Sequence, residues 1–177
     1  ARRATLGLLG LVLLAGCGGG LQTFSSAQEA YDEGVAEFEN GKCGRAIEYL
    51  RTALDFGRTS ALADDAQLTL ARAYACDRQY LLAGTEFTRF IEFYRNDRRQ
   101  EEAELGRIEG YYRLSPPYQL DQTETKRAIG YIRGYLRRFP NGEGSDQAVQ
   151  RLEELNEKLA RKQYQAGELY MRRELFE

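Results

Sequence analysis

The side chains that could act as acids, bases or nucleophiles in this chain lack the partners that such chemistry requires. The 177 residues include no histidine, which excludes a Ser-His-Asp or Cys-His centre and any imidazole metal ligand. The pairs Glu101-Glu102 and Glu153-Glu154 could supply a general acid and base, but neighbours at i and i+1 on a helix do not face each other. We interpret both pairs as solvated helix faces and predict that the protein is not an enzyme.

Two further patterns lack the spacing that ligand binding needs. Six residues instead of four separate Gly34 from Gly41-Lys42, and Cys43 stands where a phosphate-binding loop has Ser or Thr. Cys43 and Cys76 have no neighbouring ligands in a zinc-type spacing. We therefore expect no cofactor, no metal and no small-molecule substrate. With 25 basic and 27 acidic side chains, we also expect no nucleic-acid partner.

The third cysteine, Cys17, lies in a context typical of covalent lipid attachment. Two arginines precede an apolar run at positions 6–15, and Leu-Ala-Gly-Cys at 14–17 is followed by three glycines. Such a pattern indicates a secretory signal, and the run is well under the roughly 20 residues that span a bilayer. The tetrapeptide resembles a bacterial lipobox, in which the cysteine is acylated. We predict a signal peptide at 1–16, lipidation of Cys17 and a lipidated linker at 17–25; the alternative is a plain signal peptide with an incidental cysteine.

Export would place the other two cysteines in an oxidising compartment. Cys43 and Cys76 could pair or remain buried thiols, because sequence alone does not give the separation of their Cα atoms. Cleavage before Cys17 removes two of the 25 basic residues and leaves all 27 acidic ones. This negative balance argues against attachment to anionic lipid through charge and leaves the acyl group as the membrane anchor.

Beyond residue 25 the apolar spacing predicts helices only. Ser26-Ala27-Gln28-Glu29 has the pattern of a capping box, and apolar residues from Ala46 onward form the one-sided stripe of an amphipathic helix. Similar alanine-led segments begin at 46, 83 and 128, which are 37 and 45 residues apart. The eight extra residues fall around 114–121, where two prolines interrupt helix formation.

These helix pairs resemble the tetratricopeptide repeat, a helix–turn–helix of about 34 residues. The resemblance implies an all-α tetratricopeptide-repeat helical solenoid, a right-handed superhelix of helix–turn–helix units. The expected units lie at about 27–60, 64–97 and 101–142, the third with an insertion at 114–121. A connecting helix is expected at 145–159, then a partial fourth unit at 160–177, with the C-terminus truncated inside a repeat.

Similarity to this repeat family also implies a concave surface lined by the first helix of each unit. We expect a peptide-binding groove there, in which aromatic rings offer rigid contact area and an arginine pairs with a carboxylate. Two alternatives stay open: the aromatics could belong to the core between units, and the arginine could pair with a nearby carboxylate of the chain. The implied groove residues are Tyr31, Val35, Phe38, Leu68, Arg72, Glu109 and Tyr112.

A narrower resemblance extends over nearly all of the chain beyond the signal peptide. Ser-Pro-Pro-Tyr-Gln-Leu-Asp-Gln-Thr at 115–123, Phe-Pro-Asn-Gly at 139–142 and the helical segment 152–164 resemble the BamD (ComL/YfiO) family of outer-membrane protein assembly lipoproteins. The resemblance implies a non-catalytic, lipid-anchored scaffold of the β-barrel assembly (BAM) machinery on the periplasmic face of a diderm outer membrane. It implies two partners, a BamA-type barrel assembly protein and unfolded outer-membrane β-barrel proteins.

A second interaction protein is the alternative. A periplasmic repeat adaptor of the Tol–Pal, cell-envelope coordinator type would also consist of such helix pairs. Proteins of that type often carry a coiled coil before the repeats and no lipobox, and neither trait matches this sequence.

Overall fold

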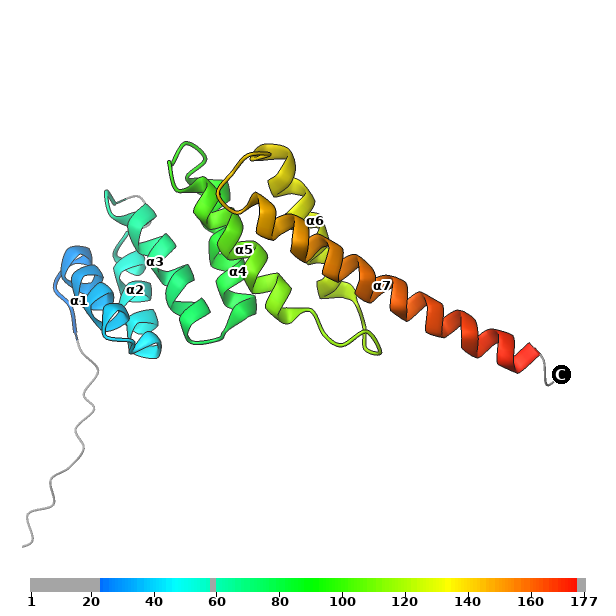
Figure 1. The fold of residues 1–177 in the computed structure, drawn as a ribbon. Helices are drawn as coiled ribbons and strands as arrows, with labels where there is room; N and C mark the ends of the chain where they lie inside the picture. The colour runs from blue at the N-terminus through cyan, green and yellow to red at the C-terminus, as the bar shows by residue number, and fades with distance from the viewer. Residues whose placement is uncertain (1–22, 58–59, 175–177) are drawn as a thin grey trace, which may run out of the picture.

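The computed structural model describes residues 23–57 and 60–174, and the regular secondary structure of these residues is entirely helical. The prediction of an all-α fold is therefore confirmed. Cys17 and the predicted signal peptide lie outside the described residues. Seven helices follow one another along the described chain (Figure 1): α1 (Ala27–Glu39), α2 (Cys43–Phe56), α3 (Ala63–Cys76), α4 (Tyr80–Phe93), α5 (Gln100–Leu114), α6 (Thr123–Arg138) and α7 (Ser145–Glu174).

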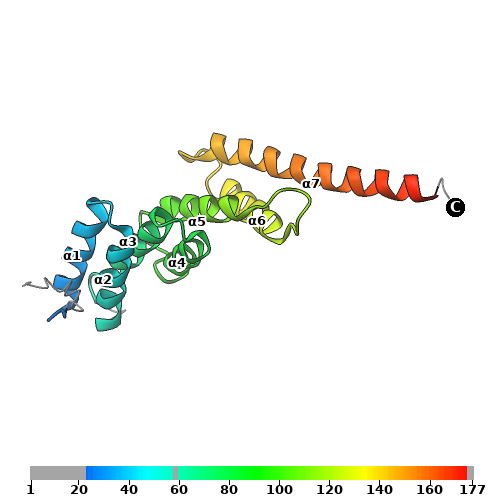
Figure 2. The ribbon, with the colours of Figure 1, turned by 90° about the horizontal axis from the view of Figure 1, so that it is seen from below.

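The helices pack in sequential order as antiparallel pairs. The contacts within the pairs α1–α2, α3–α4 and α5–α6 are matched by contacts between successive pairs, α2–α3 and α4–α5. The result is a single row of helices from α1 at one end to α6 and α7 at the other (Figures 1 and 2). The connection at 115–122 between α5 and α6 contains the two prolines and no helix.

The start of α1 is held by a capping interaction close to the predicted one. The Oγ of Ser26 accepts a hydrogen bond from the backbone N–H of Glu29 at 3.1 Å, as expected for an N-cap. The carboxylate of Glu29 reaches one residue further back than a capping box requires. It accepts from the backbone N and the Oγ of Ser25, at 2.8 and 2.5 Å, and these hydrogen bonds lower the pKa of Glu29.

Small residues occupy the points where helices cross. The recurring alanines Ala46, Ala83 and Ala128 are all fully buried. At Gly34 an added Cβ would lie only 2.8 Å from Cγ of Leu50. Close approach of two helices brings many apolar atoms into contact, so a side chain larger than alanine at these points would push the helices apart.

The apolar interior forms two clusters. The first lies among α1 to α4 and the start of α5, and its large members include Leu50, Leu68, Phe87 and Phe90. The second joins α5, α6 and the beginning of α7 around Ile108, Ile132, Tyr135 and Leu155. Burial along one face of α2 explains why the stripe from Ala46 onward predicted helix packing correctly.

Helix α7 is one continuous helix of 30 residues. Its beginning packs on the second cluster through Ala148, Leu152, Leu155 and Leu159. Most side chains beyond residue 159 are exposed, and this half extends away from the other helices (Figures 1 and 2). The expected boundary between 159 and 160 is therefore not a helix end. None of the described helices combines the length and apolar character that a membrane span needs.

Two glycine substitutions test this packing with opposite expected signs. In Gly106→Ala the new Cβ would lie 2.4 Å from Cζ of Phe87, which is 3% exposed and has little room to move. We expect a loss of about 1–3 kcal/mol in the free energy of unfolding. In Gly130→Ala the Cβ meets nothing within 4 Å, so helix propensity should add about 0.5–1 kcal/mol. Urea unfolding followed by circular dichroism measures both, and midpoint shifts of the same sign would contradict the packing.

Candidate functional site

The predicted groove residues on α1 are half-buried, and two of them pack against the first apolar cluster. Tyr31, Val35 and Phe38 all have intermediate exposure, and Tyr31 and Phe38 pack against buried residues of that cluster. Burial raises the pKa of Tyr31, and the negative charge of Asp65 raises it further. The two aromatic rings therefore serve partly as core, and only part of each surface is open to a ligand.

Leu68 corrects the groove prediction. Its side chain is 0% exposed, inside the first cluster. Helix α3 packs against α2, α4, α5 and α1, so a position that faces outward in a less crowded helix is enclosed here. Leu68 contributes to stability and is not accessible to a peptide.

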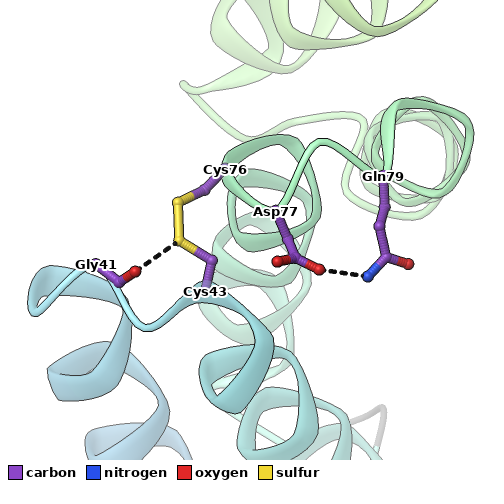
Figure 3. Close-up of a disulfide and its surroundings, with 5 residues drawn as sticks. All are labelled: Gly41, Cys43, Cys76, Asp77 and Gln79. Carbon is purple, nitrogen blue, oxygen red and sulfur yellow. Dashed lines mark hydrogen bonds between the residues drawn. A yellow bond between two sulfur atoms is a disulfide. The ribbon is translucent and has the colours of Figure 1, made fainter.

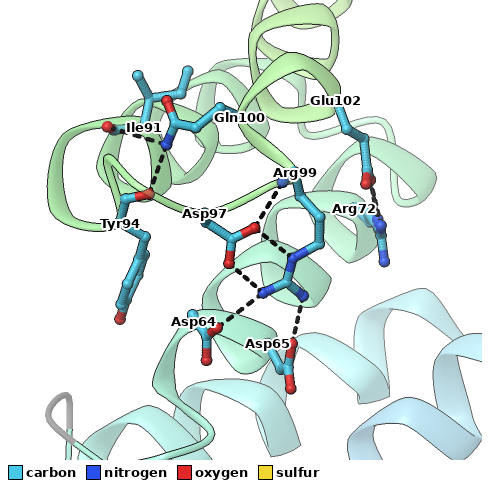
Figure 4. A network of polar contacts seen from close by, with 9 residues as sticks. All are labelled: Asp64, Asp65, Arg72, Ile91, Tyr94, Asp97, Arg99, Gln100 and Glu102. Carbon is cyan, nitrogen blue, oxygen red and sulfur yellow. Dashed lines mark hydrogen bonds and ion pairs between the residues drawn. The ribbon is translucent and has the colours of Figure 1, made fainter.

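Arg72 pairs within the chain. Its guanidinium forms an ion pair with Glu102 on α5, and its Nε donates to Oε1 of that carboxylate at 2.6 Å (Figure 4). The two side chains are 39% and 44% exposed. This is the arrangement of the open alternative, a surface arginine with a nearby carboxylate. A peptide carboxylate that reached Arg72 would have to compete with Glu102.

Glu109 and Tyr112 on α5 face the beginning of α7. Glu109 forms an ion pair with Arg151, and the hydroxyl of Tyr112 donates to Oε2 of Glu154 at 2.5 Å. The guanidinium of Arg151 also lies over the Tyr112 ring, 4.8 Å from its centre. The hydrogen bond to Glu154 raises the pKa of Tyr112, and burial adds to this effect. Both groove residues thus help to dock α7, and the seven predicted residues do not share one open surface.

An arginine that sequence reasoning missed joins the second and third helix pairs. Arg99, just before α5, pairs with Asp64 at 2.9 Å, with Asp65, and with Asp97 at 2.7 Å (Figure 4). Its guanidinium also lies 5.5 Å from the ring centre of Phe90. The acidic first turn of α3 and the nearby Asp97 and Arg99 are visible in the sequence, but their approach across 35 residues depends on the fold.

The Arg99 cluster consists of Arg99, Asp64, Asp65 and Asp97. Its arginine lowers the pKa of Asp97. Hydrogen bonds from Arg99 lower the pKa of Asp97 to about 2. A carboxyl group whose pKa is lower in the folded state than in the unfolded state stabilises the fold above its unfolded pKa. That contribution is present above about pH 4 and is lost as the pH falls toward 2. The ion pairs of Arg99 with Asp64 and Asp65 hold α3 against the start of α5.

The insertion between α5 and α6 is held by cations from α7. The Nζ of Lys158 donates to Oγ of Ser115 at 2.7 Å, and the Nζ of Lys162 donates to the carbonyl oxygen of Leu120 at 2.5 Å. The guanidinium of Arg161 lies 4.6 Å from the ring centre of Tyr118. Burial lowers the pKa of Lys158. Although this loop carries two prolines, it is a defined part of the surface and is joined to α7.

A disulfide connects the first two helix pairs. Cys43 begins α2 and Cys76 ends α3, and their Cα atoms lie 5.9 Å apart, within the usual range for a disulfide (Figure 3). Cys43 and Cys76, which the sequence left as either paired or buried thiols, therefore form a disulfide. After Cys76 the side-chain amide of Gln79 donates to Asp77 at 2.6 Å and shapes the turn into α4.

Together these features define a class of protein. Among the described residues no group of three or more His, Cys, Asp or Glu side chains is placed to hold a metal ion. The long-range contacts above join helix to helix in an open row of antiparallel pairs, which defines a helical-repeat protein of the tetratricopeptide class.

Solved structures agree with this class. The second tetratricopeptide domain of human RPAP3, solved with an HSP70 peptide, has 23% sequence identity and a TM-score of 0.54 over 73% of this chain and 94% of that chain. The first such domain of human RPAP3 has 18% identity and a TM-score of 0.55 over 78% of this chain and 95% of that chain. At this identity the likeness concerns the fold.

The family follows from the sequence match. The chain belongs to the YfiO family of outer membrane lipoproteins, whose family model matches residues 24–177. It is also 24% identical over 142 residues to the outer membrane protein assembly factor BamD of Caulobacter vibrioides. The match covers 80% of this chain and 47% of the relative, so the chain spans about half the length of the curated relative it matches. The resemblance seen in the sequence is thereby confirmed.

Loss of the disulfide should reduce stability. The 33-residue separation of Cys43 and Cys76 corresponds to about 3–4 kcal/mol from restriction of the unfolded chain. We expect the free energy of unfolding of the double variant Cys43→Ser, Cys76→Ser to be lower by about this amount, so that the variant unfolds at a lower urea concentration. Reductant should lower the midpoint of the wild type and leave that of the variant unchanged. Equal midpoints for the oxidised wild type and the variant would contradict a stabilising disulfide.

Proposed function

We propose that this protein is a non-catalytic, lipid-anchored scaffold of the machinery that assembles β-barrel proteins in the outer membrane. The observation that carries the proposal is the family match over residues 24–177. A BamA-type barrel assembly protein and unfolded outer-membrane β-barrel proteins are its proposed partners. The lipobox at 14–17 supports attachment through Cys17 to the periplasmic face of the outer membrane.

The interactions between the helices support a scaffolding role. The disulfide connects α2 to α3, the Arg99 cluster connects α3 to α5, and Glu109 and Tyr112 connect α5 to α7. Each of these contacts bridges residues that are at least 33 positions apart in sequence. A row of helices braced in this way keeps its arrangement, and a preformed surface loses less entropy when a flexible polypeptide binds.

Arg72 is the proposed contact for the substrate. It is partly exposed, as is its partner Glu102, and Arg72 is the member of the predicted groove that can bind a carboxylate in a fork. A peptide that ends in a free carboxylate could exchange with Glu102, because an exposed ion pair is worth only about 0–1 kcal/mol. Tyr31 and Phe38 would supply the remaining open aromatic surface.

The anchor predicts a labelling result. Cys17→Ala should abolish incorporation of labelled palmitate and release the protein from the membrane fraction, because acyl chains contribute about 0.8 kcal/mol per buried methylene. The wild type should fractionate with the outer membrane. Equal palmitate incorporation in the variant would contradict lipidation of Cys17, and a wild type found in the inner membrane would contradict the proposed location.

The peptide contact predicts a titration result. Arg72→Ala should weaken binding of a peptide from the last strand of an outer-membrane barrel roughly tenfold or more, since a charge-assisted pair that the bound peptide shields from water contributes about 1.5–3 kcal/mol, more than the exposed pair with Glu102. Arg72→Lys should recover part of the affinity. Glu102→Gln should strengthen binding because it removes the competing carboxylate.

The control for this titration is Arg127→Ala. Arg127 has a similar exposure, 44%, and pairs with Glu124 on its own helix, α6. That variant should bind the peptide like the wild type. Equal affinities for the wild type, Arg72→Ala and Glu102→Gln would show that Arg72 is not part of the binding surface. The scaffold proposal would then rest on the family match alone.

A further inference from the structure

Helix α6 has a cationic face that the described chain does not neutralise. Two of its arginines, Arg127 and Arg138, pair with glutamates of the same molecule. Arg133 and Arg137 are exposed, and within 23–57 and 60–174 neither forms an ion pair. Lys126 is also exposed and has Asp121 as an electrostatic neighbour. Three cations therefore face solvent along one side of a helix in a chain whose net charge is −2.

Two glycines lie on the same face between these cations. A Cβ added at Gly130 would meet nothing within 4 Å, and one at Gly134 would meet only the end of the Arg137 side chain, at 4.0 Å. By contrast, Gly84 and Gly106 allow close packing inside the molecule, with neighbours at 2.8 and 2.4 Å. Glycine within a helix is destabilising relative to alanine. Since no intramolecular contact uses Gly130 or Gly134, this face is open to the close approach of another backbone.

Helix α1 has the complementary face. It contains five acidic and no basic side chains. Glu29, Asp32, Glu33 and Glu39 are exposed, with the small and exposed Ala36 between them. Glu29 and Asp32 accept hydrogen bonds from uncharged neighbours, and within the described ranges neither Glu33 nor Glu39 forms an ion pair. α1 packs mainly against α2, which leaves its acidic side free.

The two faces match in register when the helices run antiparallel. Lys126 then lies opposite Glu39, Gly130 opposite Ala36, Arg133 opposite Asp32 and Glu33, and Arg137 opposite Glu29. The residues span 11 positions on α6 and 10 on α1, which corresponds to about 16 and 15 Å of helix. Small residues meet at the centre, where the axes are closest, and opposite charges meet on both sides.

We propose that the cationic face of α6 docks on the acidic face of α1 in a second copy of this chain. The two faces belong to opposite ends of the row of helices, with α2 to α5 between them (Figures 1 and 2), so they do not meet within one molecule. The contact is therefore head-to-tail, and it produces open chains or rings of copies. It is independent of the proposed assembly function.

Sedimentation velocity on the full chain carrying Cys17→Ser tests the proposal without an acyl group. At low salt the sedimentation coefficient should rise with concentration, and at high salt the rise should disappear, because exposed charges are screened. Arg133→Glu and Glu33→Lys should each raise the concentration of half-association roughly tenfold or more, since like charges then face each other. Arg51→Glu is the matched control for Arg133→Glu, because it changes the net charge by the same amount at an exposed position of α2, and it should associate like the wild type.

A mixing experiment makes the test specific to the proposed pair of faces. Arg133→Glu retains a normal α1, and Glu33→Lys retains a normal α6. At a concentration where the wild type associates, each variant alone should be monomeric. An equimolar mixture should associate, because every contact between the two variants then joins either two normal faces or two faces of reversed charge. The double variant Arg133→Glu, Glu33→Lys should regain association. Circular dichroism checks that all variants keep the helical content of the wild type.

Three results would overturn the proposal. The first is a wild type that stays monomeric at low salt, and the second is an Arg51→Glu variant that dissociates as readily as Arg133→Glu. The third is a monomeric wild type that floats with phosphatidylglycerol-containing vesicles but not with phosphatidylcholine vesicles, with flotation lost in Arg133→Glu. That last outcome would assign the α6 face to an anionic lipid surface.

Discussion

Close approach of neighbouring helices, permitted by a small residue at each crossing, is the constraint on which the rest of the structure depends. Gly34 leaves room for Leu50 within the first pair, and Gly106 leaves room for the ring of Phe87 between the second and third pairs. The recurring alanines Ala46, Ala83 and Ala128 are fully buried. Because the axes lie close, α3 is enclosed by its neighbours, and carboxylates on one pair come within reach of arginines on the next. The Arg99 cluster and the Arg72–Glu102 pair follow from this spacing.

Local patterns in the sequence predicted what depends on local physics. The apolar stripe from Ala46 and the prolines at 116 and 117 were sufficient for the helices and the interruption after α5. The side-chain environment of Leu68 and Arg72 was not accessible in this way. A family rule assigns both to an open face, but Leu68 is covered by packing, and the partner of Arg72 lies 30 residues away on α5. The sequence alone could not decide whether Cys43 and Cys76 form a disulfide, because pairing depends on the distance between two helices.

The segment 115–123, which carried the family resemblance, has a physical role in the structure. Gln122 donates to the carbonyl oxygens of Pro117 and Leu120, at 2.8 and 3.0 Å, and so closes the loop on itself. Lys158 and Lys162 then tie the loop to α7. An insertion in a repeat protein is often a variable surface feature. Here it is a brace between the third helix pair and the long helix.

Because the disulfide joins two neighbouring helix pairs, the stability of the fold depends on whether its surroundings are reducing or oxidising. A protein that crosses a membrane as a thread must stay unfolded until it has passed. In a reducing cytosol Cys43 and Cys76 cannot pair, so α2 and α3 lack their covalent link and the native arrangement is less populated. In an exported chain, oxidation on the far side then closes the bond and makes folding difficult to reverse. The redox state of these two sulfur atoms therefore affects the stability of the folded chain.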